Sequence, residues 1–73
     1  MWIKPTISSQ SYIALRQECN DKKLKLWAAN NQNHYYEIGG YYAVYCKFSN
    51  MLIHSADTLQ EIANYLKIGG NYE

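Results

Sequence analysis

The fold is predicted mainly from residues 34–48, which read HYYEIGGYYAVYCKF. Two runs rich in tyrosine and apolar residues, 34–38 and 41–48, are separated by a pair of glycines. Tyrosine and valine favour strands, and glycine adopts the positive φ that a two-residue hairpin turn requires. The stretch therefore predicts a β-hairpin, and a further strand is predicted at residues 51–54 after a short turn.

The register of this predicted hairpin decides which side chains share a face. One face would carry three cross-strand pairs, namely Ile38 with Tyr41, Tyr36 with Ala43, and His34 with Tyr45. The opposite face carries Val44, Cys46 and Phe48, which lack polar tips. We expect that second face to pack on the core and the tyrosine face to point outward.

The segments on either side of the hairpin have their own periodicity. After a cap at Ser8, Tyr12, Leu15 and Cys19 recur at helical spacing up to about residue 20, which predicts an amphipathic helix. Residues 23–26 alternate between polar and apolar side chains, as a half-buried strand does, although residues 22–27 could instead extend that helix.

A second helix is predicted near the end of the chain. Thr58 and Glu61 have the spacing of a capping box, and Gly69 is expected at the C′ position that ends the helix. Its apolar stripe consists of Leu59, Ile62, Ala63 and Leu66. The sequence thus predicts a single α+β domain over residues 1–73, in the order α-β-β-β(-β)-α, whose antiparallel sheet packs on two helices.

Composition excludes several classes of function. The chain has 73 residues and a net charge of +1, so it can bury one small core, and it carries little excess charge for binding phosphates. Its two cysteines and two histidines lack the close spacing of a structural zinc site, and Gly39-Gly40 does not join a strand to a helix as a phosphate loop would. We therefore expect no enzyme, no catalytic residues, no metal and no cofactor.

Targeting signals are also missing from the sequence pattern. The first residues hold no apolar run after a basic start, and no stretch approaches the roughly 20 apolar residues of a membrane span. We expect a cytoplasmic protein without a membrane partner, in which Cys19 and Cys46 are free buried thiols.

The outward tyrosine face suggests a binding function. Tyrosine gives a large contact area at low entropic cost, and it is enriched at interfaces. The candidate partner-binding residues are Tyr36, Ile38, Tyr41, Tyr45 and Trp27, with Lys47 and Glu37 as orienting charges. The same face could instead be purely structural or could close a homodimer.

The kind of partner is inferred from composition. Richness in Tyr, Asn, Ile and Lys with little Arg or Pro is the pattern expected of a compact accessory protein of a phage or mobile element. The first hypothesis is an anti-CRISPR-like inhibitor that docks on a larger host or defence complex, such as a nuclease or CRISPR effector, and blocks it sterically.

Nucleic-acid binding, single- or double-stranded, is the alternative hypothesis. The order helix, three strands, helix is similar to that of the double-stranded-RNA-binding domain. That family's second helix begins with a lysine-rich phosphate-binding motif, whereas the helix predicted here begins DTLQE at residues 57–61. The single-strand version would stack bases on Trp27, Tyr36, Tyr41 and Tyr45 and follow the backbone with Lys23, Lys25 and Lys47.

Overall fold

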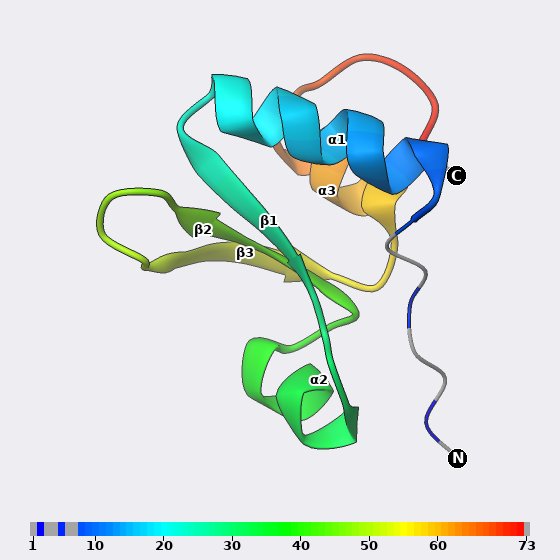
Figure 1. The fold of residues 1–73 in the computed structure, drawn as a ribbon, viewed down its shortest axis with the longest axis vertical. Helices are drawn as coiled ribbons and strands as arrows, with labels where there is room; N and C mark the ends of the chain where they lie inside the picture. Colours follow the sequence, from blue (N-terminus) through cyan, green and yellow to red (C-terminus); the bar gives the residue numbers. More distant parts are fainter. Residues whose placement is uncertain (1, 3–4, 6–7, 73) are drawn as a thin grey trace.

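A computed structural model describes residues 2, 5 and 8–72 and shows an α+β fold, as predicted. Its elements are, in order, α1 (Gln10–Asp21), β1 (Leu24–Ala28), α2 (Gln32–Ile38), β2 (Tyr42–Cys46), β3 (Leu52–Ala56) and α3 (Leu59–Tyr65). The three strands form one antiparallel sheet in the order β1-β2-β3. Figure 1 shows α1 and α3 together on one side of this sheet and α2 beyond the other side.

Helix α1 forms where its periodicity predicts it. Its cap is Ser9 and not Ser8, because the Ser9 hydroxyl accepts a hydrogen bond of 3.1 Å from the Tyr12 amide. Tyr12, Leu15 and Cys19 are its buried residues, as expected. The helix ends where Lys23 adopts the left-handed conformation, with φ of 65°, and this turn sends the chain into β1. Residues 24–28 are therefore a separate strand and not an extension of α1.

The predicted hairpin at Gly39-Gly40 is wrong, because residues 32–38 form α2. The Asn31 side chain caps the start of this helix by accepting a 2.8 Å hydrogen bond from the His34 amide. Gly39 has φ of 83°, and the amides of Gly39 and Gly40 both donate to the Tyr35 carbonyl, so the glycines end a helix. A Cβ on Gly40 would lie 2.7 Å from the Ala56 carbonyl oxygen, so this residue also lets the chain pass close to β3.

Strand β2 is the centre of the sheet and pairs with a strand on each side. It is in register with β1 through Leu26↔Val44 and with β3 through Val44↔His54. Between Val44 and Tyr45 the register against β3 shifts, so that Tyr45 lies opposite Leu52. This irregularity places one extra residue in β3, as in a β-bulge.

The main core lies between the sheet and the helix pair α1 and α3. Its largest fully buried side chains are Leu15, Cys19, Val44 and Ile62. Thr58 caps α3 as predicted, since its hydroxyl accepts a 3.2 Å hydrogen bond from the Glu61 amide. The apolar stripe predicted for α3 is confirmed: Leu59, Ile62 and Ala63 are buried, and Leu66 is partly buried against the main core.

The end of α3 differs from the prediction. The helix ends at Tyr65, and Lys67, with φ of 58°, adopts the left-handed conformation expected of Gly69. The Ile68 amide donates to the Ala63 carbonyl at 2.9 Å, which is the hydrogen bond of a Schellman motif that spans five residues. Ile68 is buried in the main core, so the contact of its side chain outweighs the cost of a left-handed lysine.

A second, smaller core lies on the other face of the sheet. It consists of the buried residues Ala29, Ile38 and Ala43, with Trp2, Tyr35 and Tyr45 packed against them. The sheet is therefore covered by two helices on one face and, over part of the other face, by α2. Within the described residues, no helix is long and apolar enough to cross a membrane.

Candidate binding surface

The part of the second face that α2 leaves uncovered is the first component of the candidate site. We call it the open sheet face; it consists of Lys25, Trp27, Tyr45 and Leu52. These side chains share a face because Lys25 pairs with Tyr45, Tyr45 with Leu52, and Trp27 with Ala43 of the second core. Trp27 is 51% exposed and Leu52 is 47% exposed, whereas Tyr45 is half-buried.

The second component is the end of the β2–β3 hairpin, which projects away from the three helices in Figure 1. We call it the apolar hairpin tip; it consists of Phe48, Met51 and Ile53. Phe48 is 76% exposed and Met51 is 68% exposed. The tip adjoins the open sheet face at the start of β3, because Leu52 lies between Met51 and Ile53 in the chain.

Hydrogen bonds hold the hairpin loop in one conformation. The Asn50 amide donates to the Cys46 carbonyl at 2.9 Å, and Asn50 has φ of 57°, which suits asparagine better than most other residues. The Lys25 ammonium group donates to the Asn50 side chain at 3.0 Å and so ties the loop to β1. The apolar side chains are therefore presented on an ordered loop, which lowers the entropic cost of binding.

A shallow depression of about 380 Å³ lies beside Trp27. Its lining residues are Lys25, Trp27, Asn30, His34, Tyr45 and Asn50. Aromatic, amide and cationic groups line it, and no carboxylate does. The depression can hold a side chain of a partner, and its charge favours one that is neutral or negative.

The structure separates the residues that the sequence predicted as one site. Trp27 and Tyr45 do lie together on the open sheet face, and Lys47 is exposed in the adjoining hairpin loop. Ile38, expected outside, is 6% exposed and belongs to the second core. Tyr36 and Glu37 are exposed, but on α2. Tyr36 and Ile38 therefore do not share a strand face with Tyr45, because the hairpin that would align them does not form.

Tyr41 belongs to an aromatic cluster that covers the second core. Its ring centroid is 4.7 Å from that of Tyr35 and 5.5 Å from that of Trp2. Tyr35 also contacts Tyr36 at 5.5 Å. A side-chain hydrogen bond with Asp57 raises the pKa of Tyr35. The role of Tyr35 and Tyr41 is therefore largely packing.

The apolar hairpin tip is what sequence reasoning missed. Alternation with period two predicts Phe48 on the core face, but strand β2 ends at Cys46. The Cys46 amide pairs with the Met51 carbonyl at 2.9 Å, so residues 47–50 form a loop outside the sheet. Asn50, a residue that tolerates positive φ, was the sequence signal for a turn, but it does not tell where the strand before it ends.

Two titratable groups near this surface, Cys46 and His54, have partners within the fold. Hydrogen bonds from Ser49 lower the pKa of Cys46, which is a free, half-buried thiol and not the buried one expected. His54 stacks on Tyr65 with ring centroids 4.0 Å apart, on the other face of the sheet. The described part of the chain has no group of three or more His, Cys, Asp or Glu side chains placed to hold a metal.

Comparison with protein-family models, with curated proteins and with solved structures gives no match for this chain.

Proposed function

We propose that this chain is a non-enzymatic protein-binding module that docks through the apolar hairpin tip and the open sheet face. The observation that supports this proposal is the exposure of Phe48, Met51, Leu52 and Ile53, all within residues 48–53 at the end of the β2–β3 hairpin. Monomeric proteins rarely expose contiguous apolar patches unless the patch contacts another molecule. Burial of one such side chain contributes roughly 1.5–3 kcal/mol, so a few of them suffice to anchor a partner.

The partner we propose is a larger host protein or defence complex, for example a nuclease or CRISPR effector, which the chain blocks sterically. A domain with a radius of gyration of 11.4 Å can cover a functional surface of a larger protein without chemistry of its own. Exposed Lys47 beside the tip would orient the complex through its charge.

The test replaces the tip without disturbing either core. The double variant Phe48→Ser with Met51→Ser should keep the melting temperature within a few degrees, because both side chains are largely exposed. Affinity-tagged wild-type protein, expressed in its native host, should retain a stoichiometric partner that the double variant loses. Ile13→Ser is the matched control, since Ile13 is 52% exposed on α1 and far from the tip in sequence. A partner that survives the double substitution, or is lost equally with the control, contradicts the proposal.

Single-stranded nucleic acid is the second candidate ligand, because Trp27, Tyr45 and Lys25 share the open sheet face. Two aromatic rings with one cation form a small stacking platform, and each stacked base contributes about 1–3 kcal/mol. A labelled oligonucleotide of about 20 nucleotides should then shift at about 50 mM salt, weaken as salt rises, and fail to shift with Trp27→Ala. Absence of any shift at low salt rules this candidate out.

A further inference from the structure

The free edge of β1 carries backbone groups that the sheet leaves unpaired. The Ala29 amide donates to the Tyr41 carbonyl at 2.8 Å, and the Lys47 amide donates to the Lys23 carbonyl at 3.1 Å. These two bonds fix the alternation of the antiparallel ladder, in which the odd-numbered residues of β1 bond to β2. The amides and carbonyls of Leu24, Leu26 and Ala28 therefore point away from β2, along the edge of the sheet.

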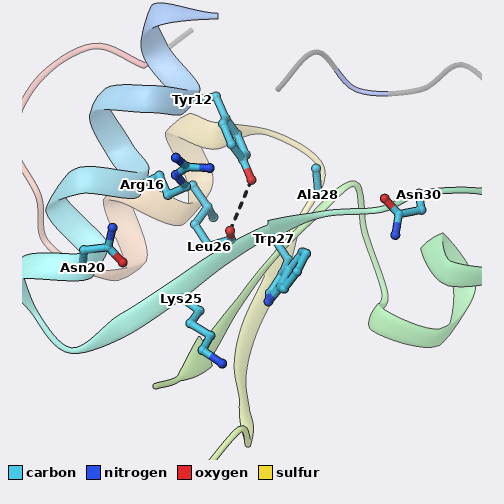
Figure 2. A pocket seen from close by; sticks show the side chains of 8 residues that line it. All are labelled: Tyr12, Arg16, Asn20, Lys25, Leu26, Trp27, Ala28 and Asn30. Atoms are coloured by element: carbon cyan, nitrogen blue, oxygen red, sulfur yellow. Dashed lines mark hydrogen bonds between the residues drawn. The ribbon is translucent and has the colours of Figure 1, made fainter. Parts of the chain in front are cut away.

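A groove of about 360 Å³ follows this edge between α1 and β1, as Figure 2 shows. Its lining residues are Tyr12, Arg16, Asn20, Lys25, Leu26, Trp27, Ala28 and Asn30. The Tyr12 hydroxyl donates to the Leu26 carbonyl at 3.2 Å, and within the described residues this is the one hydrogen bond that reaches the free edge. The side chains of Leu26 and Ala28 are buried in the main core, so these residues line the groove with the main-chain edge of the strand.

The charged groups of the groove are all positive. Arg16 and Lys25 line it, and no carboxylate does. Arg16 is exposed, and its guanidinium forms no ion pair or hydrogen bond with any described residue. Glu18 and Asp21 of α1 lie outside the groove, and the Asp21 carboxylate accepts a hydrogen bond from Gln17 at 3.3 Å. The groove is therefore complementary to a negative charge.

We propose that this groove binds an extended peptide segment of a partner protein that carries a carboxylate side chain, and that the segment adds to β1 as a fourth strand. The free amides and carbonyls of Leu24 and Ala28 and the amide of Leu26 pair with its main chain. The carboxylate binds the Arg16 guanidinium, which can donate two parallel hydrogen bonds. The exposed ring of Trp27 gives an apolar neighbour a surface to contact.

A second copy of the chain fits this edge less well. Antiparallel pairing of two β1 strands would bring together two grooves that each carry Arg16 and Lys25 and no carboxylate, and like charges brought close together destabilise such a pairing. An acidic segment instead meets these cations with opposite charge. The groove shares Lys25 and Trp27 with the open sheet face, but it goes beyond the proposed function because the main-chain groups that it uses lie on the edge of β1, opposite to β3 in the sheet.

The test is an NMR titration of the ¹⁵N-labelled full chain with the capped peptide Val-Thr-Val-Glu-Val-Thr-Val. Binding should shift the amide resonances of Leu24, Leu26 and Ala28 and slow their hydrogen exchange. Two matched peptides separate the contributions: one has lysine in place of glutamate, and the other has N-methyl groups on alternate main-chain amides, which block strand pairing. Both should bind at least about tenfold more weakly.

Variants of the protein complete the test. Arg16→Gln should weaken the glutamate peptide about tenfold and leave the lysine peptide unchanged, whereas Arg16→Lys should restore part of the difference. Unchanged resonances of Leu15 and Ile62 show that the fold is intact. The proposal is overturned by equal binding of the N-methylated peptide, by shifts confined to the hairpin tip, by dimers that protect Leu24 and Ala28 without peptide, or by no shift at about 2 mM peptide. The double substitution at Phe48 and Met51 leaves this groove intact, so the two proposals can fail separately.

Discussion

Tyr12 shows how one side chain connects the core to the edge of the sheet. Its ring is 4% exposed and lies 6.1 Å from that of Tyr42, while its hydroxyl reaches the Leu26 carbonyl. Burial raises the pKa of Tyr12, and Arg16 partly offsets this rise. A phenylalanine would fill the same space but would leave that carbonyl without its donor, which explains the use of tyrosine here.

The buried thiol of Cys19 makes stability depend on alkaline pH. Burial, with a further contribution from Glu18, raises the pKa of Cys19 from 9.0 to about 11. In the unfolded chain the thiol ionises near pH 9.0, whereas in the folded chain it stays neutral up to about pH 11. The contribution of Cys19 to the free energy of unfolding is thus fully present below pH 9.0 and is lost as pH rises through about 11. Urea unfolding should show a loss of at most ~3 kcal/mol across this interval.

Two variants identify the group responsible for this loss. Cys19→Ala removes the thiol and should flatten the dependence of the free energy of unfolding on pH in that interval. Cys46→Ala should keep the dependence, because the pKa of Cys46 is lowered and not raised. An equally steep decline with Cys19→Ala would assign the effect to other groups, such as Tyr12 and Tyr42, whose pKa values burial also raises.

Helix α2 shows how caps decide the structure of a short element. Seven residues form too short a helix to be stable alone, so α2 depends on Asn31 at its start, Gly39 at its end and the packing of Ile38. Its tyrosines favour a strand, and the tertiary context overrides that preference.

Alanine substitutions at Gly39 and Gly40 test whether these residues are needed where α2 ends, and Gly69 provides the control. Gly39→Ala should cost about 1–2 kcal/mol because alanine is strained at φ of 83°. Gly40→Ala should cost at least as much, about 1–3 kcal/mol, because its Cβ would lie 2.7 Å from the Ala56 carbonyl oxygen and β3 would have to shift. Gly69→Ala is the control: nothing lies within 4 Å of its Cβ, so the change should stay within about 0.5 kcal/mol.

Thermal and urea unfolding check these values. If the Gly39→Ala and Gly69→Ala variants had the same free energy of unfolding, Gly39 would not be needed to end α2. A stable Gly40→Ala would contradict the close approach of the chain to β3.

The same glycines explain why sequence reasoning predicted some elements and not others. Helices α1 and α3 were found because their apolar spacing and caps agree, and β1 because its side chains alternate. A glycine pair after HYYEI fits both a hairpin turn and a helix end. What selects the helix is the side-chain cap at Asn31 and the contact of Gly40 with β3, and that contact joins residues far apart in the chain.

At the scale of the whole molecule, two cores of unequal size share strand β2. Ala43 and Val44 are adjacent, both are fully buried, and they face opposite cores. Leu15→Ala empties the centre of the main core and should cost about 3–5 kcal/mol, a large part of the stability of so small a domain. Ile38→Ala affects the smaller core, which can relax around α2, and should cost only about 2 kcal/mol.

Urea unfolding measures both losses, and near-ultraviolet circular dichroism locates them. Ile38→Ala should reduce the near-ultraviolet signal of the aromatic cluster formed by Trp2, Tyr35 and Tyr41. The helix content contributed by α1 and α3 should stay unchanged. Equal destabilisation by the two substitutions would show that the second core is as important as the first.

The candidate site was predictable only in part at this scale. The alternation of its strand predicts that Trp27 faces outward, the hairpin register predicts the same for Tyr45, and the structure brings the two side chains together. The sequence could not indicate that α2 covers part of the second face, because a strand was expected at those residues. The exposure of Phe48 and Met51 depends on where β2 ends, and strand ends are poorly specified by alternation alone.

The contrasting positions of the two tryptophans give the protein two internal optical reporters. Trp2 lies in the aromatic cluster with its indole nitrogen shielded from solvent, whereas Trp27 is half exposed on the open sheet face. Emission from Trp2 reports on the second core, and emission from Trp27 responds to whatever covers that face. Trp27→Phe would leave Trp2 as the sole tryptophan, so comparison with the wild-type protein separates the spectral changes of docking from those of local unfolding without any attached dye.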